Sequence, residues 1–183
     1  MTELLQKREL LAQAECGLVA DLLQKRGWML ATAESCTGGM IAATCTDQAG
    51  SSAWFERGLV TYSNRAKTEL LGVDPALIAG HGAVSEAVAR AMVQGAVART
   101  PAQVAVAVTG VAGPGGGSAD KPVGTVWFGF ALPGQVLAER CQFAGDRAQV
   151  RRATVQHALV RLGQLLQAQH AVPNNTTMTP TTD

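Results

Sequence analysis

The sequence predicts an α/β fold, namely a three-layer α/β/α sandwich with a mixed sheet of about five strands. Two observations lead to this prediction. Segments of helical pattern alternate with short apolar segments of strand type along the first 110 residues. Residues 103–109 are nearly all apolar, which is typical of a strand that helices cover on both faces. We expect one domain over residues 1–170, because 183 residues suffice for a single folded unit.

The expected elements follow in chain order. The first helix, residues 4–26, should end at Gly27 and pack through one leucine face. That face consists of Leu4, Leu11, Leu18 and Leu22. The other expected helices cover residues 40–45, 64–71, 75–79, 85–99 and 146–167. The expected strands cover residues 28–33, 54–62, 103–109, 123–131 and 135–143, the last two forming a hairpin around Leu132-Pro133-Gly134.

Residues at the helix starts support these boundaries. Ser85 is a suitable N-cap for the helix that follows it. Asp146 is another, and Gln149 stands three positions later, as a capping box requires. The last residues, 171–183, are polar and rich in Thr and Asn, so we expect a disordered tail.

Composition excludes several classes of function. A net charge of +1 and 4% aromatic residues argue against a nucleic-acid partner. No apolar run reaches the ~20 residues needed to cross a bilayer, so no membrane association is expected. The four cysteines form no CxxC pair and have no histidine at metal-ligand spacing, which predicts free thiols, no metal site and a cytoplasmic protein.

Three segments of unusual chemistry follow predicted strands. They are Glu34-Ser35-Cys36, Tyr62-Ser63-Asn64 and Thr109-Gly110. Ligands of open α/β sheets bind at the carboxyl ends of the strands. We therefore expect these three segments to form one binding site.

Ser35 lies where a strand turns into a helix. There it can act as a nucleophile, and the unpaired amides at the helix start can bind an oxyanion or a phosphate. Gly38 would allow a ligand to approach the backbone closely. The alternative is an ordinary N-cap serine.

A serine nucleophile needs a base, and Lys67 is a candidate. It lies one helical turn beyond Asn64, so that it can point back to the strand end that bears Tyr62. The Tyr62 phenol could relay or orient a proton. The alternative is a solvated lysine and a tyrosine in the core. A Cys36–His pair is less supported, because none of the three histidines adjoins an acidic residue or a strand end.

Two further segments invite a phosphate-binding or nucleotide-binding interpretation. Arg147 and Arg151 lie one turn apart at a helix start, which also fits a capped helix with solvated arginines. The glycine-rich residues 110–124 match neither the Walker pattern nor the dinucleotide fingerprint, and they fit a loop over a pocket or a plain connection.

Together these segments resemble the CinA C-terminal domain family from about residue 10 to residue 168. The resemblance rests on several motifs in a fixed order. They are Glu34-Ser35-Cys36-Thr37-Gly38-Gly39, residues 60–67 (Val-Thr-Tyr-Ser-Asn-Arg-Ala-Lys), Leu71-Gly72-Val73, Gly82-Ala83-Val84-Ser85, residues 109–116, Lys121-Pro122-Val123-Gly124 and Gly145-Asp146-Arg147.

The family includes PncC-type nicotinamide mononucleotide amidohydrolases. The resemblance implies hydrolysis of the nicotinamide amide to nicotinic acid mononucleotide and ammonia by an α/β/α homodimer without a cofactor. It implies Ser35 as nucleophile, Lys67 as base and Tyr62 beside them. The expected substrate-binding residues are Cys36, Thr37, Gly38, Asn64, Thr109, Gly110, Arg147 and Arg151. The alternatives are a nucleotide-binding protein without activity and a Ser–Lys amidase for another small amide.

Overall fold

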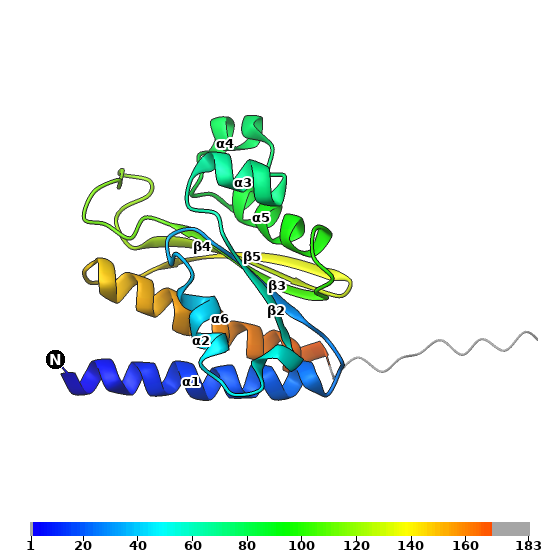
Figure 1. The fold of residues 1–183 in the computed structure, drawn as a ribbon. Helices are drawn as coiled ribbons and strands as arrows, with labels where there is room; N and C mark the ends of the chain where they lie inside the picture. The colour runs from blue at the N-terminus through cyan, green and yellow to red at the C-terminus, as the bar shows by residue number, and fades with distance from the viewer. Residues whose placement is uncertain (1, 170–183) are drawn as a thin grey trace, which may run out of the picture.

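A computed structural model describes the backbone of residues 2–169 and the side chains of residues 12–169. The predicted disordered tail, residues 171–183, lies outside the described residues. Within them, the chain folds into a sheet with helices on both faces (Figure 1). The predicted three-layer α/β/α arrangement is confirmed.

The sheet is mixed, and its strands run in the order β2-β1-β3-β4-β5. Strands β1 (Leu30–Glu34), β2 (Phe55–Val60) and β3 (Val104–Gly110) pair in parallel. Strands β4 (Thr125–Leu132) and β5 (Gln135–Gln142) form the predicted hairpin, and β4 pairs antiparallel with β3. The carboxyl ends of the three parallel strands therefore meet at one edge of the sheet.

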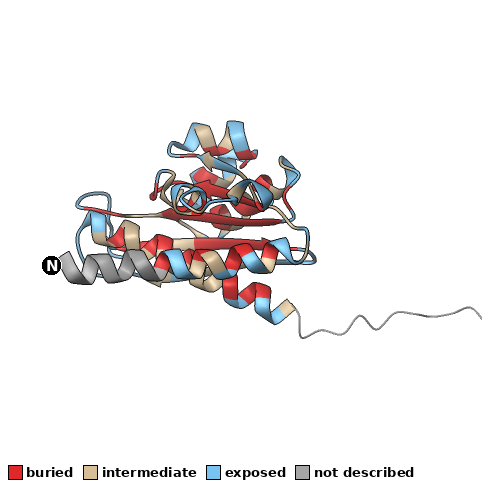
Figure 2. Cartoon of the chain, turned by 60° about the horizontal axis from the view of Figure 1, so that its bottom comes forward, coloured by how far each residue is buried: buried red, intermediate tan, exposed pale blue. Residues whose placement is uncertain are grey.

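The helices divide between the two faces of the sheet (Figure 1). One face is covered by α1 (Thr2–Gln24), α2 (Met40–Thr46) and α6 (Arg147–Ala168). The other is covered by α3 (Asn64–Leu71), α4 (Pro75–His81) and α5 (Glu86–Ala98). A short 3-10 helix, η1 (Ser51–Ala53), precedes β2. Figure 2 shows the buried residues gathered along the strands and on the helix faces turned toward them.

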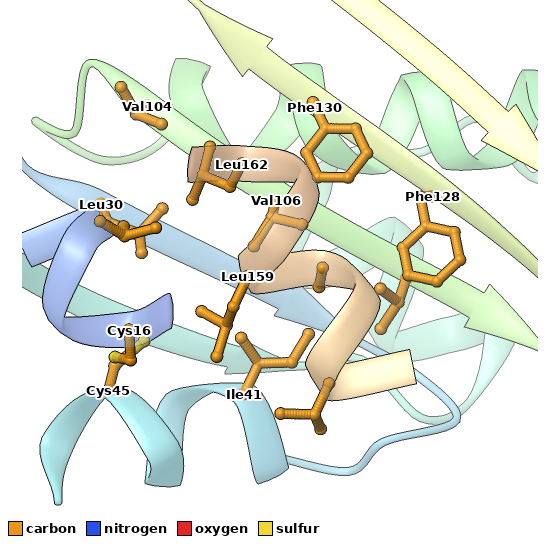
Figure 3. Packing of buried hydrophobic residues seen from close by; sticks show 14 of the residues in the cluster. Cys16, Leu30, Ile41, Cys45, Val104, Val106, Phe128, Phe130, Leu159 and Leu162 are labelled. Atoms are coloured by element: carbon orange, nitrogen blue, oxygen red, sulfur yellow. The ribbon is translucent and has the colours of Figure 1, made fainter. Parts of the chain in front are cut away.

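Each face of the sheet has its own core because side chains alternate along a strand. The valines of β3 at positions 104, 106 and 108 belong to the core with α1, α2 and α6. In that core, Leu159 and Leu162 of α6 lie over Val104 and Val106 (Figure 3). Ala105 and Ala107 belong to the other core, with α3, α4 and α5. Small side chains on this second face let α5 lie close to the sheet.

The expected leucine face of the first helix is wrong where the structure describes it. Leu18 is 37% exposed, and Leu22 only packs against the edge of the core. The buried face instead consists of Ala12, Cys16, Val19, Ala20 and Leu23. Three of these residues, Ala12, Cys16 and Ala20, are small, and leucine spacing alone does not reveal such a face. Leu4 and Leu11 lie outside the residues whose side chains are described.

The predicted helix caps are confirmed. The Ser85 hydroxyl accepts a hydrogen bond from the Val88 N–H at the start of α5. Asp146 and Gln149 form the reciprocal capping box at the start of α6. Because these caps fix where α5 and α6 begin, they also fix the loops that precede each helix.

Gly129 of β4 tests the close contact between α5 and the sheet. A Cβ at this position would collide with the backbone carbonyl oxygen of Ala89 in α5. We expect Gly129→Ala to lower the free energy of unfolding by about 1–3 kcal/mol, because the helix must move away. The measurement is urea unfolding followed by circular dichroism.

Gly80→Ala is the matched control, since a Cβ at Gly80 of α4 would meet no atom within 4 Å. Alanine also favours helix over glycine, so this variant should be as stable as the wild type or slightly more stable. Equal stability of the Gly129→Ala protein and the wild type would contradict the tight packing of α5.

Candidate active site

The three strand-end segments meet around a pocket of about 190 Å³. Of the residues that the sequence singled out, those lining the pocket are Ser35, Cys36, Tyr62, Asn64, Lys67, Thr109, Gly110 and Arg147. Ala83, Val84 and Ala112 complete the lining and were not predicted. A larger hollow, of about 310 Å³, lies between α1, α2 and α6, but no strand end reaches it. The candidate catalytic residues therefore lie in the smaller pocket.

Ser35 and Lys67 form a direct hydrogen bond in this pocket. The Lys67 Nζ donates to the Ser35 Oγ at 3.0 Å. It also donates to the Thr61 carbonyl oxygen at 2.9 Å and to the Tyr62 carbonyl oxygen at 3.4 Å. The Lys67 side chain reaches this position because Ser63 caps α3 and sets where the helix begins. The serine hydroxyl and its candidate base are therefore already in contact.

The environment of Lys67 favours its neutral form. The residue is only 1% exposed, and no salt bridge to it occurs among the described residues. Burial lowers the pKa of the Lys67 ammonium, and the neighbouring Cys36 opposes this effect only in part. A lysine with a lowered pKa can accept a proton from a hydroxyl, as a general base must.

Cys36 is poorly suited to be the nucleophile. Burial raises the pKa of its thiol to about 12, and the Glu34 charge adds to this effect. The thiol is therefore protonated near neutral pH, whereas a reactive cysteine must be a thiolate. Neither His81 nor His157 lines the pocket, and His170 lies outside the described residues. The arrangement thus favours Ser35 over a Cys–His pair.

The turn after β1 differs from the expected helix start. The N-cap of α2 is Gly39, so Ser35 is not a capping serine. The N–H of the N-cap Gly39 and those of Ile41 and Ala42 in the first turn of α2 are not free for an oxyanion either, because they donate to the Glu34 carboxylate. The correction affects the expected oxyanion site and leaves the expected role of Ser35 as nucleophile unchanged.

Tyr62 and Arg147 meet at the mouth of the pocket. The Tyr62 hydroxyl accepts a hydrogen bond from Arg147 Nη2 at 3.1 Å, and the Tyr62 side chain is largely exposed. A second Arg147 nitrogen, Nη1, donates to the Gly113 carbonyl oxygen of the glycine-rich loop at 3.0 Å. Only the backbone carbonyl of Tyr62 faces Lys67. In this structure the phenol therefore makes no proton path between Ser35 and Lys67.

Three of the expected substrate-binding residues are absent from the pocket lining, namely Thr37, Gly38 and Arg151. The Thr37 hydroxyl is buried and donates to Glu34 at 2.6 Å. The Arg151 guanidinium donates to the carbonyl oxygens of Cys36 and Thr37 at 3.1 and 2.7 Å. Arg151 thus supports the Ser35 turn, and Arg147 is the arginine that reaches the pocket.

Thr109 and Gly110 lie where β3 ends. The Thr109 hydroxyl donates to the Ala83 carbonyl oxygen at 2.9 Å and so ties the loop before α5 to the pocket. A Cβ at Gly110 would lie 2.8 Å from the Thr125 carbonyl oxygen of β4. Glycine is therefore needed here for strand pairing. No group of His, Cys, Asp or Glu among the described residues could hold a metal ion.

Comparison with known proteins identifies the family of this chain. The CinA C-terminal domain model matches residues 12–166, and the chain belongs to the CinA C-terminal domain family. It is 59% identical over 134 residues to the nicotinamide-nucleotide amidohydrolase PncC of Enterobacter agglomerans, covering 73% of this chain and 82% of that protein. It is 53% identical over 147 residues to the protein of the same name from Escherichia coli K12, covering 80% and 89%.

Solved structures give the same result for the fold. A CinA superfamily protein from Klebsiella pneumoniae superposes with a TM-score of 0.82 at 41% identity, covering 86% of this chain and 98% of that one. A CinA superfamily protein from Escherichia coli gives 0.79 at 37% identity, covering 84% and 91%. No helix in the described part of the chain is long and apolar enough to span a membrane.

Proposed function

We propose that this protein is an amidohydrolase that converts nicotinamide mononucleotide to nicotinic acid mononucleotide and ammonia, with Ser35 as nucleophile and Lys67 as general base. The observation that supports it most is the buried hydrogen bond of 3.0 Å between Ser35 Oγ and Lys67 Nζ inside the pocket. The substrate is inferred from the relatives named nicotinamide-nucleotide amidohydrolase.

The proposed reaction begins with proton transfer from the Ser35 hydroxyl to the neutral Lys67 amine. The Ser35 oxygen forms a bond to the carboxamide carbon, giving a tetrahedral oxyanion. When the carbon–nitrogen bond breaks, the Lys67 ammonium gives its proton to the departing nitrogen, which leaves as ammonia. Lys67 then takes a proton from water, and the resulting hydroxide releases the acid from Ser35, whose oxygen recovers the proton.

The size of the pocket suits one end of the mononucleotide. Its volume of about 190 Å³ lies below the ~300–1,000 Å³ of sites that enclose whole ligands. We infer that the pyridine carboxamide enters beside Ser35, while the ribose phosphate extends over the rim. Arg147 stands at that rim with two of its five N–H donors in use, which leaves donors for a phosphate.

Two alternatives make different predictions. A nucleotide-binding protein without activity would bind the mononucleotide and release no ammonia, yet it would have no need for a buried Ser–Lys pair. An amidase for another small amide would use the same pair and ignore the phosphate. The homodimer that the resemblance implies and the cytoplasmic location that the cysteines indicate remain predictions.

Ser35→Ala should lower ammonia release by several orders of magnitude, because the covalent route loses its nucleophile. The measurement is a coupled ammonia assay with nicotinamide mononucleotide. Cys36→Ala should keep substantial activity, and Ser52→Ala, at an exposed serine of η1, should match the wild type. More than about a tenth of wild-type turnover in Ser35→Ala would contradict the assignment, since that is a loss of under ~1.4 kcal/mol.

The rate should depend on pH through Lys67. Its pKa is lowered from 10.5, and only the neutral amine can accept a proton, so kcat/KM should rise with pH through that lowered pKa. Lys67→Arg should be nearly inactive, because a guanidinium stays protonated. The measurement is kcat/KM from about pH 6 to about pH 10. The control is Lys25→Arg, which changes an exposed lysine far from the pocket. A flat pH profile of kcat/KM in the wild type would exclude Lys67 as the base.

Recognition should depend on the 5′-phosphate. The riboside lacks this group and should react at least ~100-fold less efficiently in kcat/KM, which corresponds to ~2.7 kcal/mol. Arg147→Ala should remove most of the preference and leave the riboside reaction largely unchanged. Arg65→Ala, at an exposed arginine of α3, is the matched control and should keep the preference. Comparable efficiencies for mononucleotide and riboside in the wild type would instead favour an amidase for another amide.

A further inference from the structure

The Glu34 carboxylate organises the turn that bears Ser35. It is fully buried at the carboxyl end of β1. It accepts from the Thr37 hydroxyl at 2.6 Å and from the Thr32 hydroxyl at 3.2 Å. It also accepts from three backbone N–H groups at 2.8–3.0 Å, which belong to Gly39, Ile41 and Ala42. One side chain thus binds the segment before Ser35 to the segment after it.

Arg151 holds the same turn from helix α6. Its guanidinium donates to the carbonyl oxygens of Cys36 and Thr37, at 3.1 and 2.7 Å. Glu34 therefore satisfies N–H groups of the turn and of α2, while Arg151 satisfies two carbonyl groups. A carboxylate only accepts hydrogen bonds and a guanidinium only donates them, so neither side chain can replace the other.

A contact from Arg151 and a backbone hydrogen bond within the turn fix the direction of two amides. In a trans peptide the N–H of a residue points opposite to the carbonyl of the residue before it. The Cys36 carbonyl points to Arg151, so the Thr37 N–H points away from that side chain. The Ser35 carbonyl accepts from the Gly38 N–H, so the Cys36 N–H points away from Gly38. Neither N–H has a backbone acceptor in the described part of the chain, but Thr37 is fully buried and outside the pocket lining, whereas Cys36 lines the pocket.

We propose that Glu34 and Arg151 are positioning residues that preorganise the Ser35 turn, so that the N–H of Cys36, a residue that lines the pocket, donates to the oxyanion. The inference rests on the proposed function, because an oxyanion forms only if Ser35 attacks a carbonyl. It extends that function by giving a role to a carboxylate that touches no substrate. Oxyanion donors act on the transition state far more than on the bound substrate, and losing one costs about 10²–10³ in kcat.

The first test is Glu34→Gln, which keeps the shape and turns one acceptor oxygen into a donor that faces N–H groups. We expect kcat with nicotinamide mononucleotide to fall by about 100-fold or more, while KM changes by less than about threefold. Glu139→Gln is the matched control. Glu139 also pairs with two side chains, His157 and Arg161, but it lies on β5 and does not line the pocket. It should keep the wild-type kcat.

The second test measures the reactivity of Ser35 without the amide substrate. Phenylmethanesulfonyl fluoride should react at Ser35, whose oxygen bonds to sulfur as fluoride leaves and Lys67 takes the proton. Intact-mass spectrometry gives the rate. We expect slower labelling in Glu34→Gln and in Arg151→Lys, since a lysine cannot donate to both carbonyls with the fixed geometry of a guanidinium. Thermal unfolding gives the folded fraction to which every rate is normalised.

The outcomes separate the two proposals. If the wild type is labelled at Ser35 but releases no ammonia from the mononucleotide, the proposed substrate fails, and slower labelling in both variants still supports the positioning role. If kcat and labelling in Glu34→Gln and Arg151→Lys stay within about threefold of the wild type, the positioning role is overturned and the proposed function stands. A rise in KM alone would likewise overturn it. Should Glu34→Gln fail to fold, Arg151→Lys and Thr37→Val decide by the same readouts.

Discussion

The site depends on the position of β1 between two parallel strands. Glu34 is the last residue of β1, and its carbonyl oxygen accepts a hydrogen bond from the Thr61 N–H, just beyond β2, at 2.8 Å. One residue later, the Ser35 N–H donates to the Val108 carbonyl of β3, at 3.0 Å. Ser35 is therefore held by the sheet, although it already belongs to a turn. Thr61 follows β2 and Thr109 lies near the end of β3, so the pocket forms where these three strands end.

Because side chains alternate between the two faces of the sheet along β1, Glu34 and Ser35 lie on opposite faces. Glu34 points to the face covered by α2, where it meets the amides at the start of that helix. Ser35 faces the other side, where Lys67 of α3 reaches it. The acidic group is thus kept away from the lysine by the sheet itself. A carboxylate beside Lys67 would raise the pKa of the ammonium and make the neutral amine, which the proposed mechanism needs, less available.

The sequence predicted much of the fold because the apolar strands and the helix caps are local signals. It also predicted that the segments containing Ser35, Lys67 and Thr109 lie together, since strand ends of a parallel sheet share one edge. It did not predict the buried face of α1, because that face includes small residues that leucine spacing does not mark. Nor did it predict the partners of Arg151, because a sequence shows which groups can donate but not which acceptors compete for them. One feature of the sequence could have indicated that Glu34 binds the helix start. It is an acidic residue just before a helix, where the helix dipole favours a negative charge.

Burial of Lys67 also links folding to proton binding. In the unfolded chain its amine has a pKa near 10.5, and in the folded protein that pKa is lower. Between the two values, the unfolded chain binds a proton that the folded protein does not, so stability rises with pH across this interval. Below the lowered pKa, the cost of a buried ammonium is present in full. Because the proposed mechanism also needs the neutral amine, the group that makes the fold costly at low pH is the one that this mechanism makes responsible for activity at high pH.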